Sequence, residues 1–83
     1  MKSKRLNTNN KLYTPKSGTT VYIDYSDKMR VLEVEFLAGK VYHYKKVEPE
    51  VWEEYKEIVN SGQSSGVYIN LNIKPNYNYE EVS

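Results

Sequence analysis

One short stretch of the sequence carries the side chains best suited to chemistry. Residues 39–47, GKVYHYKKV, place a tyrosine on each side of the only histidine and follow them with two lysines. If His43 lay beside a carboxylate on a neighbouring strand, the two could act as an acid–base couple. If the tyrosine rings and lysines were exposed, they could instead stack bases and attract phosphates, as binding of single-stranded nucleic acid requires.

Catalysis is the weaker of these two interpretations. No Ser or Thr nucleophile has a second histidine to activate it, and no motif indicates a cofactor. The chain has no cysteine, which excludes disulfides, thiolate zinc sites and thiol nucleophiles. No acidic run has the spacing of a calcium loop. We therefore expect a noncatalytic protein with no metal and no cofactor.

Length and hydropathy bound the class of protein. The chain of 83 residues is expected to form one small domain. Its start, MKSKRLNTNN, is charged but is not followed by the apolar region of a secretory signal. No apolar run approaches the roughly 20 residues that a membrane helix needs. These features predict a soluble, cytoplasmic protein with no membrane partner.

The net charge of +1 conceals an uneven distribution. Residues 1–46 contain ten Lys/Arg and four Asp/Glu, whereas residues 47–83 contain two and seven. Such a division could direct the basic half towards phosphate, or pair protomers through surfaces of opposite charge. It could also be no more than a solvated surface.

The elements that must position these residues are predicted by their periodicity. Residues 1–18 are polar and basic, which indicates a mobile tail or a loosely docked arm before a single domain over residues 19–83. TVYIDY, from Thr20, and MRVLEVEF, from Met29, are typical of strands. In the second of these, apolar residues alternate with Glu33 and Glu35.

The loop over residues 37–39 decides where the tyrosines point. A three-residue loop needs only a left-handed residue at Gly39, whereas a two-residue loop would need positive φ at an alanine. The longer loop pairs apolar side chains across the hairpin, Tyr42 with Val34 and Tyr44 with Leu32. His43 then faces Glu33 on the solvent side. The tyrosines are thus predicted to line the core, with their hydroxyls at its rim.

A helix is predicted next, beginning near Pro49 and ending at Gly62. Its apolar residues form one stripe that would cover the sheet: Val51, Trp52, Tyr55, Ile58 and Val59. The Asn, Gly and Pro content of residues 64–82 indicates a short strand or turn and a closing strand rather than a second long helix. The predicted fold is α+β: a small antiparallel β-meander of three strands, one helix on its apolar face, and a short C-terminal closing β segment.

An ordered set of landmarks resembles a known family. In order they are Tyr25 after an apolar strand, LEVEF, Gly39, Tyr42 and Tyr44, Val47–Pro49 at the helix start, SSGVYIN, Ile73 with Lys74, and Tyr77 with Tyr79. Over residues 21–82 this set resembles the KTSC domain, named for the C-terminal extension of some lysyl-tRNA synthetases. Ser26 stands where the family commonly has Asp, and Ile69 replaces an aromatic residue. The family occurs both attached to a tRNA-charging enzyme and as a small separate protein, and the resemblance suggests RNA binding through the first of these two contexts.

The leading hypothesis is therefore a small noncatalytic RNA-binding module, for tRNA or single-stranded RNA. Its basic rim would comprise Lys28, Arg30, Lys40, Lys45 and Lys46, and its stacking platforms Tyr22, Tyr77 and Tyr79.

Two alternatives remain open at the level of sequence. A small-ligand or nucleotide-sequestering protein could bind an anion at Ser64, Ser65, Gly66, Asn70 and Lys74. These residues could equally form an ordinary strand start. A protein-interaction module could use the sheet edge or the acidic helix, and this module could also self-associate through opposite charges.

Overall fold

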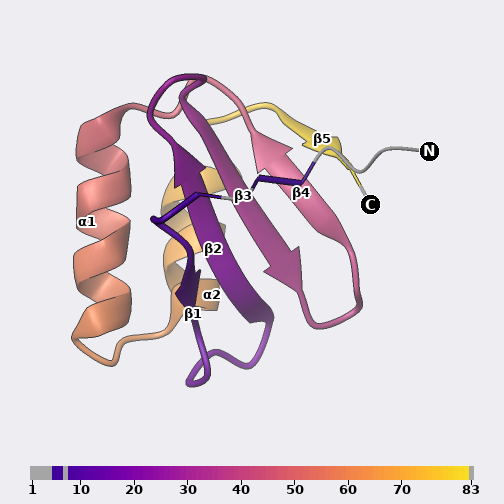
Figure 1. The fold of residues 1–83 in the computed structure, drawn as a ribbon. Coiled ribbons are helices and arrows are strands. Elements are labelled where there is room, and N and C mark those ends of the chain that lie inside the picture. Colours follow the sequence, from indigo (N-terminus) through magenta and orange to yellow (C-terminus); the bar gives the residue numbers. More distant parts are fainter. Residues whose placement is uncertain (1–4, 7, 83) are drawn as a thin grey trace.

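The computed structural model describes residues 5–6 and 8–82, and it has the predicted α+β class. Its sheet is antiparallel with five strands in sequence order (Figure 1): β1 (Leu12–Tyr13), β2 (Thr20–Ser26), β3 (Val31–Phe36), β4 (Val41–Tyr44) and β5 (Tyr79–Glu81). Between β4 and β5 the chain forms α1 (Pro49–Asn60), α2 (Ser65–Tyr68) and the π-helical segment η1 (Ile69–Ile73). No helix in this described part is long and apolar enough to cross a membrane.

The hairpin between β3 and β4 has the predicted register. Tyr42 pairs with Val34, His43 with Glu33, and Tyr44 with Leu32. Gly39 adopts φ +88°, and its N–H donates to the Phe36 carbonyl over 2.9 Å. The three-residue loop forms because glycine alone reaches this left-handed conformation without a steric penalty.

Helix α1 covers one face of the sheet, as predicted. Its Trp52 ring stacks on Tyr25 of β2 at a centroid distance of 5.5 Å. Tyr55 stacks on Tyr68 of α2 at 4.6 Å, which joins the two helices in one core. The helix ends before Gly62, whose φ of +88° allows its N–H to reach the Val59 carbonyl.

The strand or turn expected around residues 65–73 is wrong, because the chain there is helical. Ser64 caps α2 by accepting a hydrogen bond from the Val67 N–H. Ile69 and Ile73 are buried one helical turn apart. Tertiary burial of this apolar pair thus outweighs the weak helix propensity of a segment rich in Asn and Gly.

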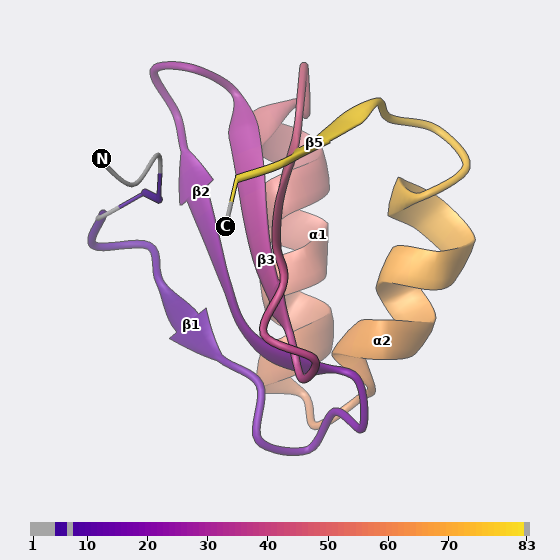
Figure 2. The ribbon, with the colours of Figure 1, turned by 90° about the vertical axis from the view of Figure 1, so that its right-hand side faces the viewer.

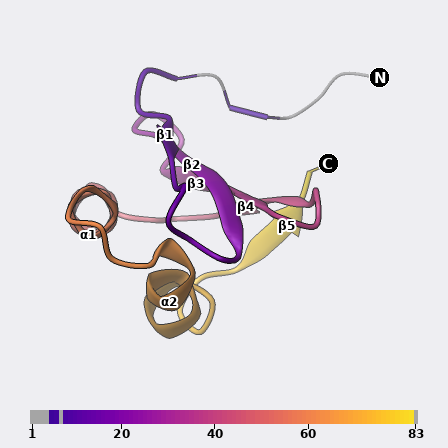
Figure 3. The same ribbon diagram turned by 90° about the horizontal axis from the view of Figure 1, so that it is seen from below.

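The sheet has more strands than predicted, because β1 pairs with β2. The described residues before β2, expected as a mobile tail or loosely docked arm, lie on the face opposite the helices (Figures 2 and 3). We call residues 5–6 and 8–14 the N-terminal cover. The expectation that Glu33 and His43 face solvent is consequently wrong, since this cover leaves both side chains buried.

Candidate functional site

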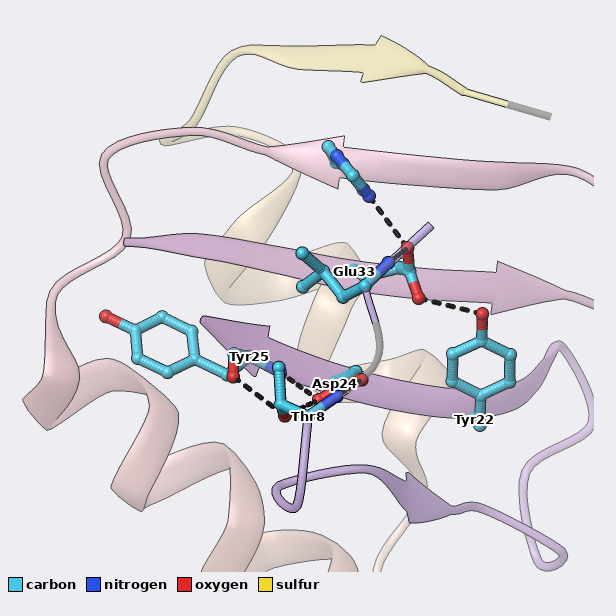
Figure 4. Close-up of polar contacts among 7 residues, drawn as sticks. Thr8, Tyr22, Asp24, Tyr25 and Glu33 are labelled. Atoms are coloured by element: carbon cyan, nitrogen blue, oxygen red, sulfur yellow. Dashed lines mark hydrogen bonds and ion pairs between the residues drawn. The ribbon is translucent and has the colours of Figure 1, made fainter. Parts of the chain in front are cut away.

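The acid–base couple considered from the sequence exists as a buried cluster centred on Glu33. Its carboxylate accepts hydrogen bonds from His43 Nε2 and the Leu6 N–H, both at 2.7 Å, and from the Tyr22 hydroxyl at 2.8 Å. Figure 4 shows Glu33 on β3 pointing towards Tyr22. Beside it, Asp24 accepts hydrogen bonds from the Thr8 hydroxyl and the Tyr25 N–H.

The electrostatics of this cluster follow from burial and hydrogen bonding. Burial alone would raise the pKa of the Glu33 carboxyl, but hydrogen bonds from His43, Leu6 and Tyr22 outweigh it and lower the pKa below its ordinary value. Burial and the bond to Glu33 raise the pKa of Tyr22. The carboxylate is therefore ionised, fully satisfied and closed to a substrate, so the cluster fastens the N-terminal cover to the sheet.

Four of the five predicted rim cations gather at one end of the sheet. Lys28 and Arg30 lie in the turn between β2 and β3, and Lys45 and Lys46 follow β4. The Val47 N–H donates to the Arg30 carbonyl over 2.9 Å, which fixes the two segments side by side. All four side chains are exposed. We call this group of four residues the basic end.

The fifth rim cation, Lys40, is not part of the basic end. It precedes β4, whereas Lys45 follows it, so the strand separates the two lysines. Each pairs with a carboxylate of β5, Lys40 with Glu81 at 3.5 Å and Lys45 with Glu80 at 3.3 Å. The predicted rim is therefore divided between the two ends of β4.

The three predicted stacking tyrosines differ in accessibility. Tyr22 is only 4% exposed, so it offers no ring face to a base. Tyr77 is half-buried. Tyr79 is 60% exposed and pairs with Tyr44 of β4, with its ring centroid 4.8 Å from that of Tyr42 and 5.9 Å from that of Tyr44. Beneath it, burial and the neighbouring phenols raise the pKa of Tyr44 to about 12, so that ring stays neutral.

The predicted anion site does not form a single constellation. Ser64 caps α2, and buried Ser65 bonds the Tyr55 hydroxyl. Gly66 packs so closely that an added Cβ would lie 2.1 Å from Thr19 Oγ1. Asn70 is exposed, and Lys74 lies over the Phe36 ring. Ser64 and Ser65 therefore stabilise the helical segment, whereas Asn70 and Lys74 lie apart from those hydrogen bonds. No three His, Cys, Asp or Glu residues of the described chain are placed to hold a metal ion.

Comparison with known proteins identifies the family of this chain. The model of the KTSC domain matches residues 16–77. The chain belongs to the KTSC domain family. A lysine–tRNA ligase of Nostoc punctiforme is 33% identical over 72 residues, which are 87% of this chain but 12% of the ligase. A KTSC domain protein from Yersinia pestis has a crystal structure of the same fold, with a TM-score of 0.66, 24% identity, and coverage of 81% of this chain and 89% of that one.

Within this KTSC domain, sequence reasoning missed two accessible aromatic residues. Tyr42 was predicted to line the core and Phe36 was not considered as a site residue, but both are half-buried at the end of the sheet near the β3–β4 loop. Their rings are 5.3 Å apart at the centroids, and Lys74 lies 5.4 Å from the Phe36 centroid. Tyr42 lies on the apolar face, as predicted, but no pattern in the sequence indicates that the helices leave this end of the face open.

Proposed function

We propose that this KTSC domain is a noncatalytic RNA-binding module that uses the basic end and the exposed ring of Tyr79. One observation carries the proposal: Arg30 and Lys46 adopt φ values of +55° and +59° on neighbouring segments. The left-handed conformation costs an L-residue roughly 1–2 kcal/mol, a penalty that glycine escapes. Strained backbone of this kind concentrates at functional positions, here with two cationic side chains.

The charge and exposure of the basic end support the proposal. Lys28, Arg30 and Lys46 have no salt bridge within the described residues, so their charges are available to phosphate. Lys45 pairs with Glu80, but both partners are about half exposed, and such pairs contribute only about 0–1 kcal/mol. A phosphate can therefore displace that carboxylate at little energetic cost.

The aromatic component is Tyr79. Its exposed ring packs against the rings of Tyr42 and Tyr44, and these two contacts fix its orientation. A base stacked on such a platform gains about 1–3 kcal/mol without regard to its identity. Cations at both ends of β4 and an exposed ring beside the strand together suit an unpaired strand of RNA.

The comparisons suggest which RNA to examine first. A segment similar to this chain lies within a protein whose name gives tRNA as its substrate. Fluorescence anisotropy with labelled tRNA and with unstructured RNA, at several salt concentrations, would measure affinity and its salt dependence. We expect the logarithm of the association constant to fall with that of salt, with a slope of about −0.7 for each phosphate neutralised on a single strand.

Single charge reversals provide a matched comparison. Lys46→Glu should weaken binding severalfold and reduce the salt slope by about 0.7 or more. Lys56→Glu makes the same charge change on α1, among glutamates, and should leave both quantities nearly unchanged. Equal effects of the two variants, or no binding by the wild-type protein at low salt, would refute the proposal.

A further inference from the structure

An open pocket of about 220 Å³ lies at the opposite end of β4 from the basic end. It is lined by Phe36, Ala38, Lys40, Tyr42 and Lys74. The β3–β4 hairpin contributes the first four residues, and Lys74 follows η1. Two aromatic rings and two exposed lysines thus meet in one concave site, although they come from parts of the sequence more than thirty residues apart.

We infer that this pocket binds one unpaired nucleobase together with the phosphate attached to its sugar. The inference deepens the proposed function, because the base would belong to the RNA strand that the basic end holds. Phe36 and Tyr42 supply the aromatic surface on which a base stacks. Lys40 and Lys74 supply cations for the phosphate at the mouth of the pocket.

The size of the pocket limits the ligand to a single base. Sites for drug-sized molecules occupy about 300–1,000 Å³. The pocket is smaller than this range, and its aromatic wall consists of only two rings. It therefore suits one planar ring system and a flanking phosphate, whereas a dinucleotide or a larger cofactor would extend out of it.

The present contacts of the two lysines leave them available. The Lys74 ammonium lies over the Phe36 ring and makes no salt bridge in the part of the chain that the structure describes. Lys40 pairs with Glu81, but these two side chains are 56% and 43% exposed, so water already competes for their charges. A bound phosphate would draw both ammonium groups towards itself, and Lys74 would uncover a face of the Phe36 ring.

The pocket is also aligned with the basic end. A strand rises about 3.3 Å per residue, so the five steps from Lys40 to Lys45 across β4 span only roughly 17 Å. Tyr79 pairs with Tyr44 between them. One short single strand can therefore contact the basic end, stack on Tyr79 and place a base in the pocket.

The test is an NMR titration of the full chain with a mononucleotide, adenosine 5′-monophosphate or uridine 5′-monophosphate, to about 10 mM. We expect shifts concentrated on the five pocket residues. Adenosine or uridine without phosphate should cause the same shifts with weaker affinity, and inorganic phosphate should cause small shifts spread over many lysines. No shift at the pocket, or a response indistinguishable from that to inorganic phosphate, would overturn the inference.

Variants separate the pocket from general charge effects. Tyr42→Leu preserves apolar packing but removes the ring. It should weaken binding of the mononucleotide by about 5-fold to 150-fold, the range for losing one stacked base. Tyr13→Leu is the control, since it removes a tyrosine ring that is 64% exposed and lies on β1, which β2 and β3 separate from β4. Glu81→Gln should strengthen binding by releasing Lys40. Equal losses from Tyr42→Leu and Tyr13→Leu would contradict the inference.

The two proposals fail in distinguishable ways. Mononucleotide shifts at the pocket in a protein that binds no RNA would refute the proposed function and leave the pocket as a nucleotide site. RNA binding that depends on Lys46, without any mononucleotide response at the pocket, would refute only the inference.

Discussion

The buried carboxylate of Glu33 should be the most sensitive point in the fold outside the hydrophobic core. Glu33→Ala removes the acceptor for three donors at once, the Leu6 N–H, His43 Nε2 and the Tyr22 hydroxyl. A buried donor left unpaired costs about 1–3 kcal/mol. Part of this cost is relieved if water enters the space vacated by the side chain. We therefore expect the free energy of unfolding to fall by about 3–5 kcal/mol, a large share of the 5–15 kcal/mol typical of a whole domain.

Glu33→Gln should be much milder. The amide oxygen can still accept from Leu6 and His43, and the amide N–H can donate to the Tyr22 hydroxyl, which is able to accept. The main loss is the negative charge of the acceptor. A hydrogen bond to a neutral acceptor is weaker than one to a charged acceptor by about 1–2 kcal/mol. We therefore expect the wild-type protein to be the most stable, Glu33→Gln to be less stable, and Glu33→Ala to be the least stable.

Urea denaturation monitored by Trp52 fluorescence would measure this order, since Trp52 is buried against Tyr25 and reports loss of the core. Glu35→Ala is the matched control, because Glu35 lies two residues along β3 and is only half-buried. It should cost less than about 1 kcal/mol. If Glu33→Ala were no more destabilising than Glu35→Ala, the carboxylate would not hold the N-terminal cover.

Three further predictions follow from particular contacts. Folding lowers the pKa of the Glu33 carboxyl below its ordinary value, so the unfolded chain binds more protons in acid. The melting temperature should therefore fall as the pH drops below about 5, and it should fall less steeply in Glu33→Gln; parallel pH profiles of the two proteins would contradict this. Gly66→Ala should lower the free energy of unfolding by about 1–3 kcal/mol, because the added Cβ would clash with Thr19 Oγ1. Adding Thr19→Ala should recover much of that loss, as measured by chemical denaturation of the double variant. No recovery would show that the strain lies elsewhere. Lys46→Gly should raise the free energy of unfolding by up to about 1 kcal/mol, because glycine adopts the left-handed conformation without strain. The same variant should weaken RNA binding in the anisotropy assay. A loss of stability would show that the Lys46 side chain supports the fold.

Local features of the sequence were sufficient to predict the hairpin and the long helix. A left-handed glycine at position 39 selected the loop, and the alternation of apolar residues on β3 then allowed only one register. The apolar stripe between Pro49 and Gly62 likewise predicted α1 and the face that it buries. These signals are reliable because the residues that create them are neighbours in the chain.

The tertiary structure alone decided which polar residues are buried and which aromatic residues are open. Glu33 alternates with apolar residues as a solvent-facing residue would, and only the Leu6 N–H, 27 residues away, reveals that its face is covered. Lys74 meets Phe36 only because η1 returns to the end of the sheet. The periodicity of a segment predicts which of its residues share a face. Which segment then packs on that face depends on contacts between residues far apart in the sequence, and a local pattern contains no information on the free energies of those contacts.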